Sequence, residues 1–218
     1  KDADLSALLS YCYFMVGNSS AANTYLSQAK QIDDTAASVT WNEVRQLAKQ
    51  GNLTKAIVTA RKGIKLYAND SEGIALLGSI LRANGEIEEA LNLLEVAISL
   101  DSSCSNALIN RGFIRLSRNE KSEALSDFEV VFSEKPNIRA AWDQLVKLKI
   151  DLEQFEDAVH TLNLIIQLQP DEAKHYLNLG LCHKALGNLR DASTAYRKSL
   201  EMNPNQSEIY NEVGLILK

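Results

Sequence analysis

The chain has 218 residues, of which 45% are apolar and 23% charged, and its formal net charge is -5. An acidic balance does not favour binding to phosphate backbones, and no apolar run reaches the roughly 18 residues that a membrane-spanning helix needs. We therefore expect neither a nucleic-acid partner nor membrane insertion.

A period of 34 residues runs through the whole chain. Alanine keeps this spacing at Ala22, Ala56, Ala90, Ala124, Ala158 and Ala192. Proline keeps it at Pro136, Pro170 and Pro204, and glycine at Gly17, Gly51 and Gly85, with Gly187 three periods later. A fixed period of this length predicts a solenoid, in which each repeat contacts only its neighbours.

The period divides residues 1–218 into a single solenoid domain. Its predicted repeats are 3–36, 37–70, 71–104, 105–138, 139–172 and 173–206, followed by a terminal helix over 207–218. Each repeat has the apolar pattern of two amphipathic helices: glycine ends the first helix, and proline follows the second. We expect the chain to be a fragment of a longer protein.

The last full repeat carries the resemblance to a known family. It has Tyr176 at position 4, Leu179 and Gly180 at positions 7 and 8, Ala192 at 20, Tyr196 at 24, Ser199 at 27 and Pro204 at 32. In these positions the chain resembles the tetratricopeptide repeat (TPR) family. The resemblance implies an all-α fold, a right-handed α-solenoid of helix-turn-helix units whose first helices line a concave face.

Some positions depart from the pattern. Trp41 lies one place from the expected aromatic position, and Asn119 and Glu153 replace the turn glycine. Asparagine tolerates the left-handed backbone conformation, whereas glutamate does so poorly, so we expect the turn at Glu153 to differ. Arg111 stands at a leucine-like position, with Asp127 on the facing helix. We expect these two to form a structural pair, because a buried guanidinium needs a partner.

No motif of catalysis is present. The sequence lacks a phosphate-binding glycine loop and the usual hydrolase and metal motifs. His175 and His183 are about two helical turns apart but have no evident third ligand, which favours packing or surface roles over a metal site. We therefore expect no catalytic residue, no metal and no cofactor, and we interpret the chain as not an enzyme.

The remaining candidate site is the concave groove that the resemblance implies. Position 6 of the repeats holds a partial ladder of amides, formed by Asn42, Asn110, Gln144 and Asn178. Primary amides both donate and accept hydrogen bonds, so they can bind an extended peptide backbone. Apolar Trp41, Phe113 and Leu181 and basic Arg45, Lys49 and Lys147 flank the ladder. The competing interpretation is that several of these residues pack against neighbouring first helices.

The leading prediction is therefore a scaffold that binds a protein or peptide ligand in the groove. One alternative is the substrate-recognition arm of a larger enzyme, such as a glycosyltransferase or sulfotransferase. The other is a homotypic assembly module, because residues 207–218 are apolar around most of the helix and a terminal cap should be polar outside. The sparse cysteines favour the cytoplasm, whereas four glycosylation sequons leave a secretory compartment open.

Overall fold

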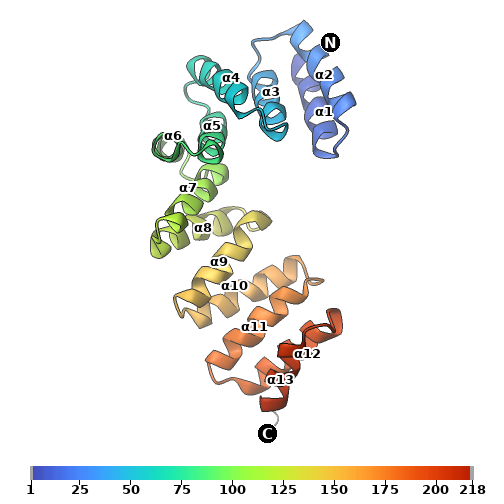
Figure 1. The fold of residues 1–218 in the computed structure, drawn as a ribbon, viewed down its shortest axis with the longest axis vertical. Coiled ribbons are helices and arrows are strands. Elements are labelled where there is room, and N and C mark those ends of the chain that lie inside the picture. Colours follow the sequence, from blue (N-terminus) through green and yellow to red (C-terminus); the bar gives the residue numbers. More distant parts are fainter. Residues whose placement is uncertain (1, 217–218) are drawn as a thin grey trace. The chain divides into compact units, whose positions relative to one another are not determined.

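The computed structural model describes residues 2–216, and within that range every regular element is an α-helix (Figure 1). The fold is the all-α helical-repeat solenoid that the period predicts. The chain forms two compact units, one ending at Arg118 and the other beginning at Asn119.

The first unit contains α1 to α7. Their bounds are α1 Ala3–Met15, α2 Ser19–Ile32, α3 Ala37–Lys49, α4 Leu53–Leu66, α5 Ser71–Asn84, α6 Ile87–Leu100 and α7 Ser105–Ser117. The second unit contains α8 to α13. Their bounds are α8 Lys121–Glu134, α9 Arg139–Asp151, α10 Phe155–Leu168, α11 Ala173–Ala185, α12 Leu189–Met202 and α13 Ser207–Ile216. We call the odd-numbered helices first helices and the even-numbered ones second helices.

The 34-residue period reappears in the helix starts. First helices begin at residues 3, 37, 71, 105, 139, 173 and 207, which are the first residues of the predicted repeats. Asparagine after the turn glycine supplies a cap: the side chains of Asn18 and Asn52 accept hydrogen bonds from the backbone N–H groups of Ala21 and Lys55. These bonds satisfy backbone donors that have no partner within the helix.

The turn inside each repeat has one left-handed residue, and its identity matters little to the backbone. Gly85 has a φ of 87°, Asn119 one of 61° and Glu153 one of 58°. The expectation that the turn at Glu153 would differ is therefore wrong. Glu153 adopts the left-handed conformation although its Cβ disfavours it, because the packing of the flanking helices fixes the chain there.

The core consists of close contacts between the two helices of each repeat. All six alanines of the period are at most 1% exposed. In α11, a Cβ added to Gly180 would lie 2.4 Å from Cδ1 of Tyr196 on α12, so only glycine lets this ring lie against the helix backbone. In α1, Ser10 donates a hydrogen bond from Oγ to the carbonyl of Ala22, 2.8 Å away on α2.

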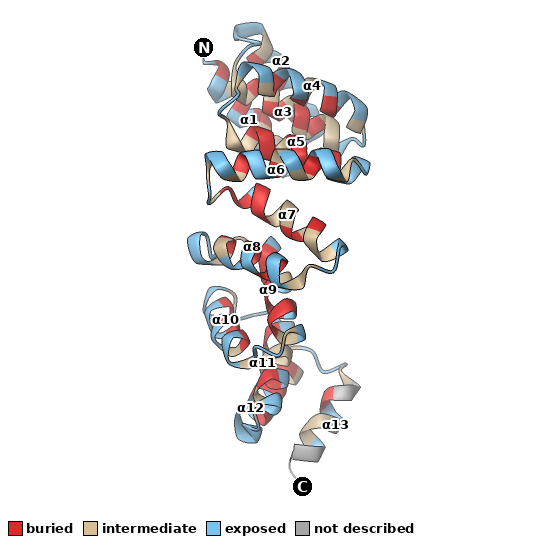
Figure 2. Ribbon diagram, turned by 90° about the vertical axis from the view of Figure 1, so that its left-hand side faces the viewer, coloured by how far each residue is buried: buried red, intermediate tan, exposed pale blue. Residues whose placement is uncertain are grey.

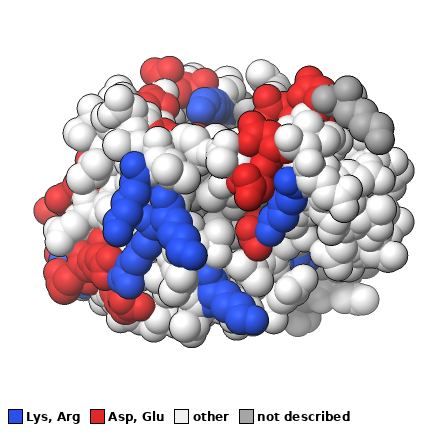
Figure 3. All heavy atoms as spheres, turned by 90° about the horizontal axis from the view of Figure 1, so that it is seen from above, with Lys and Arg blue, Asp and Glu red and all other residues white. Residues whose placement is uncertain are grey.

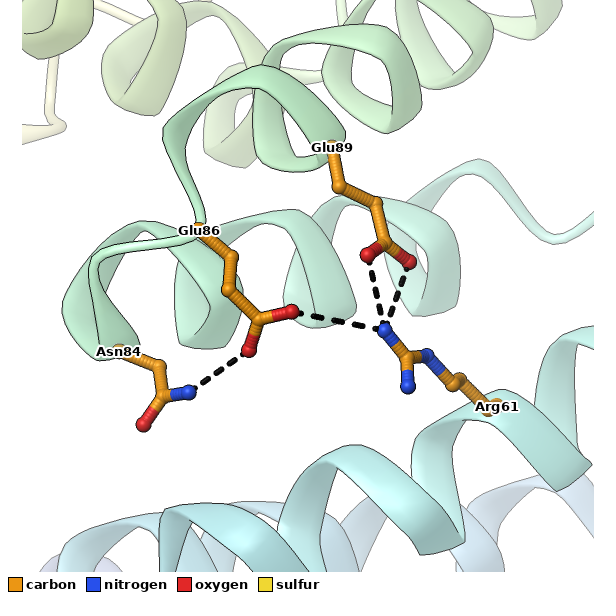
Figure 4. Close-up of polar contacts among 4 residues, drawn as sticks. All are labelled: Arg61, Asn84, Glu86 and Glu89. Atoms are coloured by element: carbon orange, nitrogen blue, oxygen red, sulfur yellow. Dashed lines mark hydrogen bonds and ion pairs between the residues drawn. The ribbon is translucent and has the colours of Figure 1, made fainter.

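One side of α6 is exposed, as its pale-blue residues show in Figure 2, and most of these residues are polar. Arg61 on α4 reaches Glu89 of α6 at 2.8 Å and Glu86 at 3.6 Å, and Asn84 donates to Glu86 (Figure 4). These side chains are about half exposed, so each pair adds little to the free energy of folding. Their main effect is to join two successive second helices.

The apolar terminal helix that the sequence predicts is only partly described. Ile209 is 3% exposed and packs with Ala192 and Tyr196, whereas Tyr210 is 54% exposed. Leu217 and Lys218 lie outside the described residues, as do the side chains of Leu215 and Ile216.

Candidate functional site on the first helices

Trp41 lies in the core of the first unit and not on the predicted groove. Cβ atoms added to Gly63 on α4 and Gly73 on α5 would lie 2.6 and 2.2 Å from its ring, so the two glycines form a slot for the indole. The indole Nε1 donates to Oδ2 of Asp70 at 2.6 Å, and Tyr67 meets the ring edge-on. At 5% exposure, Trp41 has almost no surface left for a ligand.

The amide of Asn42 is also used inside the protein. Asn42 is buried, and its Nδ2 donates to the carbonyl of Ala7 on α1 at 2.5 Å. One turn later, Gln46 Nε2 donates to Oγ of Ser10 at 2.9 Å. The paired residues are 35 and 36 positions apart, close to one repeat period. These bonds therefore hold the first helices of successive repeats, α1 and α3, against each other.

Two of the predicted basic groove residues lie over aromatic rings of α1. The guanidinium of Arg45 is 5.5 Å from the ring centroid of Tyr11, and the ammonium of Lys49 is 4.4 Å from that of Phe14. Such cation–π contacts hold a long side chain against the surface while its charge stays hydrated. These residues join α3 to α1, which agrees with the competing packing interpretation.

Asn110 and Phe113 on α7 have the same kind of role. Arg82 of α5 donates from Nε to Oδ1 of Asn110 at 3.0 Å, and its guanidinium lies 5.4 Å from the Phe113 ring centroid. The Asn110 Nδ2 donates to the carbonyl of Asn106 at 2.7 Å. In the first unit, the predicted ladder residues therefore contribute to internal contacts.

The first helices of the second unit present their side chains differently. Gln144 on α9 and Asn178 on α11 are half-buried, and neither amide has a hydrogen-bond partner among the residues that the structure describes. Lys147 is exposed, and Leu181 is 41% exposed. These four residues are free to contact a ligand.

A hollow of about 450 Å³ adjoins Leu181, between α11, α12 and α13. Leu177, Leu181 and Ile209 form its apolar walls. Tyr196 and the carboxylate of Glu212 also line it, and Lys184 at its edge pairs with Glu212. The sequence placed Tyr196 among packing residues only. A sequence signal for a further role was present: the same repeat position holds Phe128 and Leu162 in the two preceding repeats, and neither has a hydroxyl.

A second hollow, of about 490 Å³, lies between α8, α9 and α10 of the same unit. Phe132, Leu145 and Leu164 line it, and Lys149 on its floor pairs with Glu129 at 2.9 Å. This ammonium already has its counter-charge, and the hollow contains none of the predicted groove residues.

The predicted pair of Arg111 and Asp127 spans the two compact units. Arg111 belongs to the first unit and Asp127 to the second, so their pairing stays a prediction. Asp127 is 2% exposed.

Within residues 2–216, no three His, Cys, Asp or Glu side chains are grouped as a metal site would require, and no helix is long and apolar enough to cross a membrane.

Two of the three cysteines are buried, where their thiols stay protonated. Burial raises the pKa of the Cys182 thiol to about 11 and also raises that of Cys104. Both are 0% exposed and act as apolar fillers, whereas Cys12 is exposed, so the three cysteines have different settings. On the face shown in Figure 3, several basic side chains gather in one group, with acidic side chains on either side of it.

Comparison with known proteins supports the repeat interpretation. The tetratricopeptide repeat family matches residues 72–104 and again residues 173–206. A BBSome complex member, the BBS4 homolog of Drosophila melanogaster, is 24% identical over 193 residues, which cover 72% of this chain and 40% of that protein. The chain thus spans less than half the length of this relative.

Solved structures with low sequence identity share the fold. The structure of pilF from Pseudomonas aeruginosa has a TM-score of 0.76 and 19% identity, covering 96% of this chain and 95% of that one. YrrB, described as a TPR protein with an unusual peptide-binding site, has a TM-score of 0.66 and 15% identity, covering 86% and 96%. The two family matches and the helix starts spaced at 34 residues together support a protein of the tetratricopeptide repeat family.

Proposed function

We propose that the chain is a protein-interaction scaffold that binds a peptide segment of a protein partner on the first helices of its second unit. The observation that carries this proposal is the contrast between the two units. Asn42 and Asn110 are held by internal hydrogen bonds, whereas the amides of Gln144 and Asn178 have no partner among the described residues, and Leu181 nearby on α11 is exposed. The proposal assigns no catalytic step to the chain.

The chemistry of this surface suits an extended segment. Each free amide can donate to and accept from a peptide backbone, which gives affinity without fixing the ligand's side chains. Leu181 and the adjoining hollow offer an apolar contact, and Lys147 adds positive charge at the edge. We expect the ligand to combine apolar and acidic residues, because apolar anchors give most of the affinity and complementary charges speed encounter.

A peptide array probed with the purified chain tests the proposal. Peptides that bind the wild type should bind Leu181→Asp at least tenfold more weakly, since a charge is then placed at the apolar contact. Leu189→Asp is the matched control, because Leu189 is 47% exposed on α12 and lies outside the surface. Equal losses in both variants would contradict the placement of the ligand.

The amides need a test of their own. The double variant Gln144→Ala with Asn178→Ala should weaken the same peptides while leaving the melting temperature near that of the wild type. Asn110→Ala should instead lower the melting temperature and leave peptide binding unchanged, because it removes the partner of Arg82 and destabilises the first unit. Unchanged binding in the double variant would exclude these amides from the contact.

Homotypic assembly has one observation in its favour. Leu5 and Leu8 on α1 are 55% and 57% exposed, which is a large apolar area for one helix. Light scattering over a concentration series measures it: a mass that stays at one chain up to about 100 μM argues against assembly, and Leu8→Asp should abolish any concentration dependence.

A further inference from the structure

The Tyr196 hydroxyl is a buried polar group whose surroundings, as far as the structure describes them, hold no hydrogen-bond partner. Tyr196 is 0% exposed, and its hydroxyl has no hydrogen-bond partner among the residues that the structure describes. A buried hydroxyl of this kind is costly, and most of them in folded proteins are bonded. The ring cannot turn away easily, because it lies against the bare backbone of Gly180 on α11. Packing therefore holds the hydroxyl where it is.

The hydroxyl lies near the hollow between α11, α12 and α13, because the charge of Glu212, which lines that hollow, acts on the Tyr196 phenol. Tyr196 lines this hollow together with Leu177, Leu181 and Ile209. Its volume of about 450 Å³ is larger than one side chain needs and is within the usual range of ligand pockets. Asn205 and Gln206 add polar groups to its lining. Apolar walls with a few polar groups are the composition of a site that holds an apolar group and fixes its orientation by hydrogen bonds.

The charge around the hydroxyl selects the kind of acceptor. Burial, and then the charge of Glu212, raises the pKa of Tyr196 to about 12, so the phenol stays protonated and can donate. An anionic acceptor placed at the hydroxyl would face the Glu212 carboxylate, and like charges repel in a poorly solvated site. A neutral carbonyl has no such penalty.

We infer that this hollow is the anchor pocket for an internal leucine-like residue of the bound peptide, with a main-chain carbonyl of the peptide accepting a hydrogen bond from Tyr196. The inference rests on the proposed function and makes it specific. It requires an apolar side chain within the segment and disfavours a chain-terminal carboxylate. Lys184 pairs with Glu212 and holds that carboxylate at the edge of the pocket, and the ammonium offsets part of its charge.

The inference gives Tyr196→Phe an unusual pair of effects. Loss of the hydroxyl should leave the melting temperature of the free chain unchanged or raise it, because no internal bond is lost. The same change should weaken peptide binding about fivefold, which is the usual effect of one neutral hydrogen bond. The ring itself is kept, and Phe128 shows that phenylalanine occupies this repeat position in the same unit.

The experiment uses the full chain and acetylated, amidated octapeptide pools with one fixed central residue: leucine, alanine or aspartate. Binding is followed by fluorescence anisotropy for the wild type, Tyr196→Phe and Tyr67→Phe. Tyr67 is the matched control, because its hydroxyl is also buried without a partner among the described residues but lies in the first unit. We expect the leucine pool to bind best, Tyr196→Phe to weaken it about fivefold, and Tyr67→Phe to leave it unchanged.

A second arm tests the acceptor. The best leucine peptide is truncated so that its leucine is the last residue, and the free acid is compared with the amide. The amide should bind more tightly, and Glu212→Gln should reduce the difference. The inference is wrong if the alanine pool binds as well as the leucine pool, if Tyr196→Phe binds normally or melts at a lower temperature, or if the free acid binds better. Failure of every pool to bind the wild type contradicts the proposed function itself.

Discussion

Gly73→Ala tests the slot that holds Trp41. A Cβ at residue 73 would lie 2.2 Å from Cζ2 and 2.4 Å from Cε2 of the indole, distances at which one group must move. The ring has little room to do so, because Gly63 lies against its other part and Nε1 is bonded to Asp70 at 2.6 Å. The added methyl group must therefore displace either the ring or α5.

The expected loss follows from three contributions. Alanine in place of glycine inside a helix favours folding by about 1 kcal/mol. Overpacking a well-filled core costs about 1–3 kcal/mol, and pulling the buried indole N–H from Asp70 costs about 1–3 kcal/mol more. The net expectation is a loss of about 3 kcal/mol in the free energy of unfolding of the first unit, or several degrees in its melting temperature.

Urea unfolding followed by tryptophan fluorescence measures this loss. The chain has two tryptophans, so a Trp142→Phe background makes Trp41 the only reporter, and it lies in the affected unit. Gly214→Ala is the control: this helical glycine of the second unit is exposed, with nothing within 4 Å of an added Cβ, so the change should leave the transition that Trp41 reports unchanged. In thermal melts followed by circular dichroism, the Gly73→Ala penalty should shrink in a Trp41→Leu background. A Gly73→Ala chain as stable as the wild type would refute the reasoning.

Three further substitutions test the repeat packing and its pH dependence. Glu153→Gly should raise the unfolding free energy by about 0.5–1 kcal/mol, because a left-handed residue with a Cβ costs about 1–2 kcal/mol and glycine's greater freedom when unfolded offsets part of this gain; a lower midpoint in urea would contradict it. Ala158→Leu should lose about 1–3 kcal/mol at a 0%-exposed helix crossing, whereas Ala140→Leu on the exposed side of α9 should change little in thermal melting. Burial lowers the pKa of His175 below its usual value of about 6.5, so the unfolded chain takes up the proton first and stability is lost as pH falls below that value. Melting curves at pH 7.5 and 5.5 should show a smaller pH effect for His175→Gln, and an identical effect would contradict the assignment.

The helices were predictable because every repeat must solve the same packing problem. Ala158 and its five equivalents are all buried where the two helices of a repeat meet, and a larger side chain would keep those helices apart. Because the two helices of one repeat are close in sequence, the need for a small residue at their contact recurs in every repeat and leaves a periodic signal. Trp41 gave no such signal, because its slot is made by glycines 22 and 32 residues further on, each unremarkable alone. The conformation of Glu153 was missed for a related reason, since local preference yielded to the packing of the flanking helices.

The candidate site was predictable only as a set of positions, because the period does not determine how a surface side chain is used. Asn42 and Asn178 hold the same place in repeats four periods apart. Asn42 finds the carbonyl of Ala7 within reach on the preceding first helix, whereas Asn178 has no partner among the described residues. An amide that is already bonded gains little by exchanging that bond for one to a ligand, and an unbonded one gains more. Ligand contact in this chain should therefore follow the free amides and the unpartnered Tyr196 hydroxyl, and not the repeat position itself.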